Sequence, residues 1–450
     1  MDKRAAFLTL GCKVNSYETD AIRGMFEDAG YGVVNFKEIA DVYVVNTCTV
    51  TNVADRKSRQ MLHQAKKRNP KAIVIAVGCY VQAAKEDILK DSSVDFVVGN
   101  NRKSEIISIV ESLRAKNDIS TSMVIDIGAE EEFEELQVIS TMEKTRAFIK
   151  IQDGCNRFCS YCIIPYVRGR VRSRNEKDIL DEISRILEMG YKEIVLTGIH
   201  ISSYGTDRLD KVDDVYRIMP LASLIKAIAN IPGIERIRLG SLEPRIITED
   251  FVKELAKVEK FCPHFHLSLQ SGSNGVLKRM NRKYSAEEYE ERVRLIREHF
   301  EYPAFTTDVI VGFPGETDIE FEETLEFVKR IGFSAIHVFK YSRRAGTLAA
   351  KMPQQITENI KHQRSNMLTS VAKQMSKDYM AMFMGRIEKV LIEEEVEIEG
   401  RKYLIGHNER YLKLAIDKFG ENNQANKINQ LIRVRIIKSL TDEILLCQEQ

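Results

Sequence analysis

The sequence predicts an α/β protein with an N-terminal parallel-sheet domain, a central partial (β/α)6 barrel of the TIM type and a small C-terminal antiparallel β-barrel. Three observations predict this fold class. At 450 residues the chain is long enough for about three domains. Apolar strand segments alternate with helical segments over residues 1–130 and again over 141–380, as in parallel sheets. From 381 to 450, short alternating segments follow one another without a long helix.

The elements of the first domain can be placed from apolar runs and from helix boundary signals. Strands are expected over 4–10, 41–46 and 71–77, and each ends close to a cysteine. Asn15-Ser-Tyr-Glu18 has the form of a capping box, which predicts a helix that Gly30 ends. A second, basic helix is expected over 54–68.

The second alternating region begins near Thr145, after an acidic segment. Its expected strands are 147–152, 193–197, 236–239, 264–269, 306–311 and 335–341, with helices that include 177–189, 286–299 and 319–330. Functional sites in such barrels lie at the carboxyl ends of the strands. A helix over 357–384 leads to the last domain, whose expected strands are 387–399, 401–407, 411–416, 431–439 and 443–447.

Composition limits the possible function classes. Hydrophobic residues make up 44% of the chain and charged residues 30%, which argues against long disorder, collagen or a coiled coil. No apolar run approaches the roughly 18 residues of a membrane helix, and the N-terminus lacks the apolar segment of a signal peptide. We therefore expect a cytoplasmic monomer with no membrane partner. The net charge of +1 does not by itself indicate a nucleic-acid partner.

Three cysteines are clustered in Gly154-Cys-Asn-Arg-Phe-Cys-Ser-Tyr-Cys162, with C-x3-C-x2-C spacing. Zinc usually takes four ligands, and a thioredoxin-type pair would leave Cys155 without a role. Three thiolates on one loop (Cys155, Cys159 and Cys162) can hold three irons of a [4Fe–4S] cluster and leave the fourth open. A structural metal site is the alternative interpretation. The spacing, directly after the first barrel strand, resembles that of the radical S-adenosylmethionine (SAM) superfamily.

That resemblance implies that SAM binds at the open iron and is cleaved to a 5′-deoxyadenosyl radical. It also implies contacts to SAM from the ends of later strands. Tyr161 would offer its backbone to the adenine, which Ile310 and Gly312 would also approach. Thr197 and Gly198 would hold the amino group of the methionine part, and Gln270 and Ser271 would bind the ribose. Each glycine among them is also explained by a tight turn.

Cys12, Cys48 and Cys79 are dispersed in the sequence, but each follows the carboxyl end of an expected strand. These ends share one edge of a parallel sheet, so the three thiols can converge there. The alternative is three buried apolar cysteines. We predict a second cluster with an open iron. Cys262 and Cys447 are expected to be packing residues.

Three motifs containing these cysteines resemble the N-terminal domain of the methylthiotransferases: Leu10-Gly-Cys-Lys-Val-Asn-Ser-Tyr-Glu18, Val45-Asn-Thr-Cys-Thr-Val50 and Val77-Gly-Cys-Tyr80. Residues 154–174 resemble the radical core of that family, and the C-terminal barrel resembles its TRAM domain. The Leu-Gly-Cys-Lys-Val-Asn form is similar to the branch acting on N6-threonylcarbamoyladenosine in tRNA, whereas the isopentenyl-adenosine branch tends to have Tyr-Gly-Cys-Gln-Met-Asn.

The resemblance implies two [4Fe–4S] clusters and two SAM molecules per turnover. One SAM methylates a sulfur carried by the second cluster, and the other yields the radical that abstracts hydrogen from C2 of adenine 37 in the anticodon stem-loop. An electron donor and a sulfur source are implied as partners. Asn15 and Asn46 would position the second cluster or the base, although capping also explains Asn15. A ribosomal-protein side chain as substrate, or a non-catalytic iron–sulfur RNA-binding protein, are the alternatives.

Local basic patches suggest where RNA phosphates would bind. Residues 56–85 contain many basic residues and no acidic residue, although a solvated face explains such a run equally well. Basic and aromatic residues in the other two domains complete the expected RNA contacts: Arg168, Arg170, Arg172, Arg174, Lys278, Arg279, Arg282, Tyr403, Tyr411, Lys413, Arg433 and Arg435.

Overall fold

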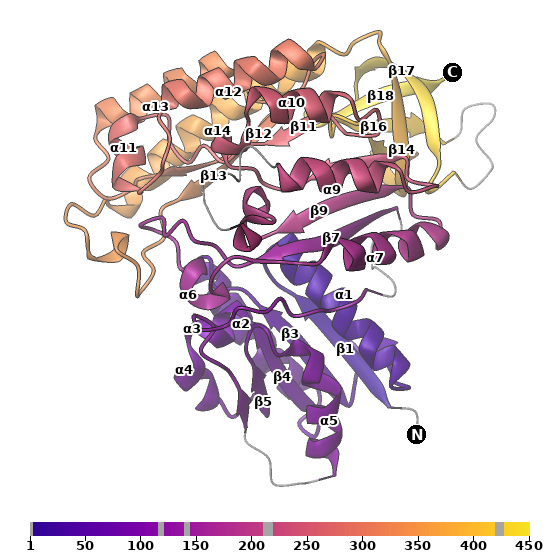
Figure 1. Cartoon of the computed structure of the whole chain (residues 1–450), viewed down its shortest axis with the longest axis vertical. Helices are drawn as coiled ribbons and strands as arrows, with labels where there is room; N and C mark the ends of the chain where they lie inside the picture. The colour runs from indigo at the N-terminus through magenta and orange to yellow at the C-terminus, as the bar shows by residue number, and fades with distance from the viewer. Residues whose placement is uncertain (1–2, 116–120, 139–144, 210–218, 419–426) are drawn as a thin grey trace.

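A computed structural model of the chain describes residues 3–115, 121–138, 145–209, 219–418 and 427–450. Figure 1 shows the N-terminal α/β domain at the bottom, the barrel domain above it and the small C-terminal barrel beside the second domain. Residues 139–144, where the expected second domain begins, lie outside the described residues. No helix in the described part of the chain is long and apolar enough to cross a membrane.

The N-terminal domain is a wholly parallel sheet with strand order β2-β1-β3-β4-β5-β6. Its strands are β1 (Arg4–Thr9), β2 (Gly32–Val34), β3 (Val42–Thr47), β4 (Ile73–Gly78), β5 (Phe96–Val98) and β6 (Ser122–Met123). Its helices are α1 (Lys13–Asp28), α2 (Asn52–Arg68), α3 (Cys79–Ala83), α4 (Lys85–Leu89) and α5 (Ile106–Arg114). The run Val42–Thr47 is buried throughout because both faces of the sheet are covered.

The expected capping box at Asn15–Glu18 is wrong. Helix α1 begins earlier, at Lys13, and its N-cap is Cys12, whose side chain makes no capping hydrogen bond. Asn15 and Glu18 are 1% and 0% exposed within the helix. Their side chains bond to other loops and to the barrel domain. The Asn-x-x-Glu spacing therefore serves contacts within and between the domains and does not cap a helix.

The central domain has six parallel strands in the order β7-β9-β10-β11-β12-β13, which form an open partial barrel. Isolated bridges from Ile237 to Phe261 and from Leu242 to Leu267 join its two halves, and β8 (Arg172–Ser173) pairs antiparallel with β7. The parallel strands are β7 (Arg146–Asp153), β9 (Glu193–Gly198), β10 (Arg236–Leu239), β11 (His264–His266), β12 (Ala304–Val311) and β13 (Ala335–Lys340). Six expected strands are thus confirmed, with β11 shorter than expected.

Helices cover the outside of this partial barrel, where their apolar faces pack on the strands in one large core (Figure 1). They are α7 (Glu176–Glu188), α9 (Pro220–Ala229), α10 (Glu249–Ala256), α11 (Asn274–Arg279), α12 (Ala286–His299), α13 (Asp318–Ile331) and α14 (Glu358–Ala381). The short helix α6 (Ile164–Arg168) lies instead at the domain boundary, where it contacts α3. Capping boxes at Ser285/Glu288 and Thr317/Glu320 fix the starts of α12 and α13.

The C-terminal domain is a closed barrel with strand order β14-β15-β16-β18-β17. Its strands are β14 (Ile387–Ile398), β15 (Arg401–His407), β16 (Lys413–Asp417), β17 (Leu431–Ser439) and β18 (Ile444–Glu449). All neighbouring pairs are antiparallel except β16–β18, which is parallel. Arg236 and Arg238, at the start of β10, donate hydrogen bonds to carbonyl groups of this barrel. The barrel therefore docks at the amino ends of the central strands, opposite the edge where a site is expected.

Candidate active site

The dispersed cysteines converge as the strand order requires. Cys12 follows β1, Cys48 follows β3 and Cys79 follows β4, and these three strands are neighbours in the sheet. Gly11 has a φ of +104°, and a Cβ placed there would lie 2.8 Å from Cys48 Sγ, so only glycine lets the two loops approach this closely. Burial and, to a smaller extent, the neighbouring thiols Cys79 and Cys12 together raise the pKa of Cys48 to about 11.

Asn15 and Asn46 connect the loops that bear these cysteines. Asn15 Nδ2 donates to the carbonyls of Leu10 and Thr47 at 2.7 and 3.1 Å, and its Oδ1 lies 3.8 Å from Cys12 Sγ. Asn46 Nδ2 donates to the carbonyl of Asn15 at 3.0 Å. Both residues therefore hold the thiols in place.

The clustered cysteines occupy the loop between β7 and α6 and are half-buried. Gly154 has a φ of +72°, and a Cβ there would overlap the carbonyl of Arg170. The loop is anchored to the segment after α11, because Ser160 donates its backbone N–H to Met280 and Asn281 donates to the Phe158 carbonyl, both at 3.0 Å. Two such sets of three sulfur ligands fit the donor chemistry of iron–sulfur clusters.

Burial, together with the neighbouring Cys159, raises the pKa of Cys155 to about 11 and that of Cys162 to about 12. Arg282 donates from Nη1 to Cys159 Sγ at 3.3 Å. This contact corrects the expectation that Arg282 meets RNA phosphate: its charge faces the cysteine loop.

A cavity of about 270 Å³ opens beside Cys162 at the carboxyl ends of the barrel strands. Tyr161, Gln270 and Ile310, which the sequence predicts as SAM contacts, all line it. Val50 and Thr51 of the N-terminal domain also line it, so both domains enclose the cavity. The other expected contacts lie outside its lining among the described residues: Thr197, Gly198, Ser271 and Gly312.

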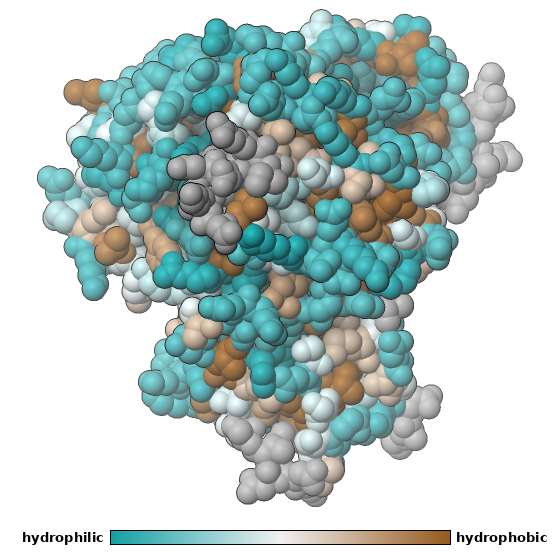
Figure 2. Space-filling model, in the orientation of Figure 1, coloured by the Kyte–Doolittle hydropathy of each residue, from teal (hydrophilic) through white to brown (hydrophobic). Residues whose placement is uncertain are grey.

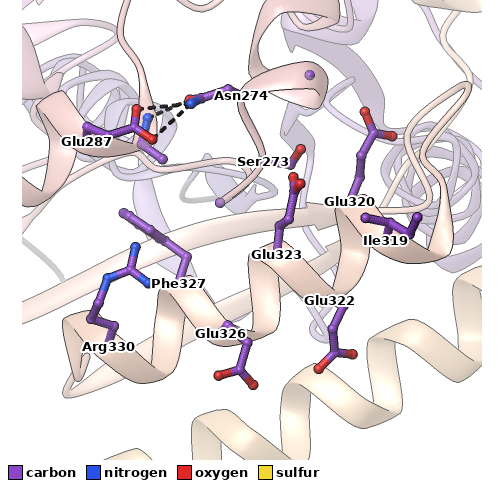
Figure 3. A pocket seen from close by; sticks show the side chains of 13 residues that line it. Ser273, Asn274, Glu287, Ile319, Glu320, Glu322, Glu323, Glu326, Phe327 and Arg330 are labelled. Carbon is purple, nitrogen blue, oxygen red and sulfur yellow. Dashed lines mark hydrogen bonds between the residues drawn. The ribbon is translucent and has the colours of Figure 1, made fainter.

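A larger hollow of about 790 Å³ lies between α11, α12 and α13. Figure 3 shows its lining, where Glu320, Glu322, Glu323 and Glu326 belong to one helix. These carboxylates would repel RNA phosphate. Among the described residues, its lining includes none of the six clustered and dispersed cysteines.

Three of the arginines after the cysteine motif were wrongly expected to contact RNA. Arg168, Arg172 and Arg174 are 0%, 1% and 1% exposed, because this segment passes between the domains and not over the surface. Arg174 pairs with Glu135 and Glu182. Of these four alternating arginines, Arg170 is exposed, and its guanidinium lies 4.8 Å above the Phe158 ring.

The remaining expected RNA contacts also fall into two groups, side chains that are buried or paired within the protein and side chains that are exposed. Tyr403 is buried in the C-terminal barrel, 5% exposed, so its ring cannot stack on a base. Arg279 pairs with Glu320. Tyr411 is 38% exposed but stacks on His407 at 4.5 Å and receives a hydrogen bond from Arg146. Several basic side chains remain at the surface: Arg56, Lys57, Lys67, Lys278, Arg433 and Arg435 are exposed, and Lys413 is half-buried.

Sequence reasoning missed a cluster on three neighbouring barrel strands. His266, Asp308 and His337 come from β11, β12 and β13, and their candidate ligand atoms lie within 4.8 Å of one another. His266 Nδ1 is 3.0 Å from the Thr306 hydroxyl, and Asp308 lines the cavity beside Cys162. The residues are far apart in sequence, so only the parallel register of the strands could have revealed them.

The geometry indicates the class of protein. A partial barrel with a three-cysteine loop after its first strand, beside a cavity, is the architecture of a radical SAM protein. A family model described as the radical SAM superfamily matches residues 149–328, and one described as uncharacterized protein family UPF0004 matches residues 4–99. The solved structure of the radical SAM methyltransferase TsrM from Kitasatospora setae, with cobalamin and a [4Fe–4S] cluster, shares this fold at a TM-score of 0.57, with 16% identity and 77% of each chain covered.

Relatives narrow the class. The chain is 40% identical to threonylcarbamoyladenosine tRNA methylthiotransferase MtaB of Bacillus subtilis, over 96% of this chain and 94% of that one. It is 42% identical to MtaB of Aquifex aeolicus, over 91% and 97%. It is also 37% identical to tRNA-2-methylthio-N6-dimethylallyladenosine synthase of Clostridium botulinum (strain Okra / Type B1), over 97% and 95%. The chain belongs to the radical SAM methylthiotransferase family.

Proposed function

We propose that this chain places a methylthio group at C2 of N6-threonylcarbamoyladenosine at position 37 of tRNA. The observation that supports this most strongly is the convergence of Cys12, Cys48 and Cys79 at one sheet edge, in addition to the radical SAM cysteine loop. Relatives named for this reaction cover nearly the whole chain. The Leu10–Glu18 motif supports the threonylcarbamoyl branch over the dimethylallyl branch.

Each cysteine set has its own task in this proposal. When bound, the cluster at Cys155, Cys159 and Cys162 supplies an electron that cleaves SAM, and the cluster at the dispersed cysteines supplies the sulfur. Tyr161, Gln270 and Ile310 bind the nucleoside part of SAM in the cavity, and its largely apolar walls exclude water.

The tRNA phosphates bind the exposed basic side chains that surround the cavity mouth and the C-terminal barrel. Arg56 and Lys57 lie near the start of α2, just after Val50 and Thr51 of the cavity wall. Arg170 is exposed beside the cysteine loop. The anticodon stem-loop is the part of the tRNA that enters, and the protein acts as a monomer with a separate electron donor and sulfur source.

Mass spectrometry of tRNA nucleosides from cells that lack the protein tests the proposal. We expect loss of 2-methylthio-N6-threonylcarbamoyladenosine, accumulation of the unthiolated nucleoside and restoration by the wild-type gene. Loss of 2-methylthio-N6-dimethylallyladenosine instead, with accumulation of its unthiolated form, would assign the chain to the other branch. Unchanged tRNA nucleosides would reject a tRNA substrate.

A further inference from the structure

One buried arginine connects the two cysteine sets. Arg168 ends helix α6, shortly after Cys162, yet its side chain reaches across the domain boundary to Cys79, the last of the dispersed cysteines. Its Nε lies 3.1 Å from Cys79 Sγ, and the residue is 0% exposed. An N–H pointed at sulfur at this distance is a hydrogen bond that a thiolate accepts better than a thiol does.

The charges do not cancel within the network of ion pairs that contains Arg168. Glu18 pairs with Arg168, with Lys150 at 2.9 Å and with Lys103 at 3.4 Å, and Asp153 pairs with Arg168 at 3.2 Å and with Lys150. These five side chains are three cations and two carboxylates, all of them buried. An unbalanced positive charge is costly in such surroundings. A thiolate at Cys79 would balance it.

The other contacts fix the direction of the guanidinium. Arg168 Nη2 donates to Asn15 Oδ1 at 2.7 Å, and Asn15 itself holds the loops of Cys12 and Cys48. On the opposite side, Asp153 accepts from Arg168 and also from the backbone N–H of Gly154 at 2.8 Å, directly before Cys155. Arg168 is therefore bonded to the supports of both ligand loops.

We propose that Arg168 is a positioning residue for the N-terminal cluster: its Nε–H donates to the Cys79 thiolate, its charge offsets the negative charge of that cluster, and its bonds to Asn15 and Asp153 fix the two ligand loops relative to each other. The inference rests on the proposed function in that it takes the dispersed cysteines as cluster ligands. Hydrogen bonds to cluster sulfur and nearby positive charge both raise a cluster's reduction potential. Removing Arg168 therefore lowers the potential of the N-terminal cluster.

The test is a redox titration, followed by electron paramagnetic resonance, of the full chain with Cys155, Cys159 and Cys162 replaced by alanine, so that only the N-terminal cluster remains. In this background we expect Arg168→Gln to shift the midpoint potential to a lower value, and Arg168→Lys to shift it less because the charge remains. Arg174→Lys is the matched control, since Arg174 is also a buried, ion-paired arginine but contacts Glu135 and Glu182. It should leave the potential unchanged.

A wild-type potential in Arg168→Gln with full iron content, or an equal shift in Arg174→Lys, would overturn the proposal. Where Arg168→Gln does not fold, Arg168→Lys decides: a potential below wild type supports the proposal, and a wild-type potential overturns it. With both clusters present, Arg168→Lys should also insert less methylthio group per 5′-deoxyadenosine formed. The titration needs no tRNA, so its result stands whether or not the proposed substrate is correct.

Discussion

Replacing Gly154 by alanine should remove the radical-forming cluster and leave the other cluster in place. Gly154 has a φ of +72°, and a Cβ there would overlap the Arg170 carbonyl, which is backbone and cannot rotate away. A side chain in this left-handed conformation costs about 1–3 kcal/mol by itself. The overlap adds to this cost or displaces the loop that begins at Cys155.

The assay is iron content and 5′-deoxyadenosine production by the reconstituted chain. Because each cluster contains four irons, we expect the iron content of Gly154→Ala to fall from about eight to about four per chain, with loss of 5′-deoxyadenosine. Gly190→Ala is the matched control: Gly190 also has positive φ, at +94°, but no heavy atom lies within 4 Å of the added Cβ. It should lose stability and keep both clusters. Full iron and normal SAM cleavage in Gly154→Ala would refute the reasoning.

Three further predictions follow from the same structure. Cys48→Ser should retain 5′-deoxyadenosine formation and abolish methylthio insertion, as measured by nucleoside mass spectrometry; full insertion would contradict a cluster at this edge. Burial alone would raise the pKa of Glu193, but Arg238 and Arg236 lower it to about 2. The ion pairs of Glu193 with these two arginines therefore stabilise the folded state fully above the unfolded-state pKa of about 4.5, and this stabilisation is lost as the pH falls toward 2. Glu193→Gln should cost about 3–5 kcal/mol in urea unfolding at pH 7 and flatten the pH dependence between these values; equal pH profiles would contradict it. Arg56→Ala combined with Lys57→Ala should weaken tRNA binding and reduce the salt slope by about one per lost phosphate contact, and an unchanged slope would place the RNA elsewhere.

Much of the fold is predictable because strand and helix periods differ clearly in this chain. Residues 42–45 are apolar at successive positions, as expected for a parallel strand covered on both faces. The three short strands β2, β5 and β6 were missed because each has too few residues to show a period. The convergence of Cys12, Cys48 and Cys79 followed from topology alone, because parallel neighbours share their carboxyl edge.

Most of the wrong site predictions concern charged residues. The local sequence pattern predicts that Arg168 and Arg174 are surface cations, because arginine is rarely buried unless it is paired. Their partners, Glu18 and Glu182, lie on other elements, and Arg168 crosses a domain boundary to reach Glu18. Figure 2 shows that hydrophilic residues dominate the visible face. Burial of this kind depends on how domains pack, which a local pattern does not contain.

The central claim is that two separate three-cysteine sites cooperate on one tRNA base. The most direct measurement is nucleoside mass spectrometry after the purified, reconstituted chain is incubated with SAM, a reductant and tRNA that contains N6-threonylcarbamoyladenosine. The account predicts the 2-methylthio nucleoside with wild-type protein, and unchanged N6-threonylcarbamoyladenosine when serine replaces a cysteine of either set. Methylthio insertion by protein that lacks Cys12, Cys48 or Cys79, or SAM cleavage by intact wild-type protein with no change in the nucleoside, would contradict it.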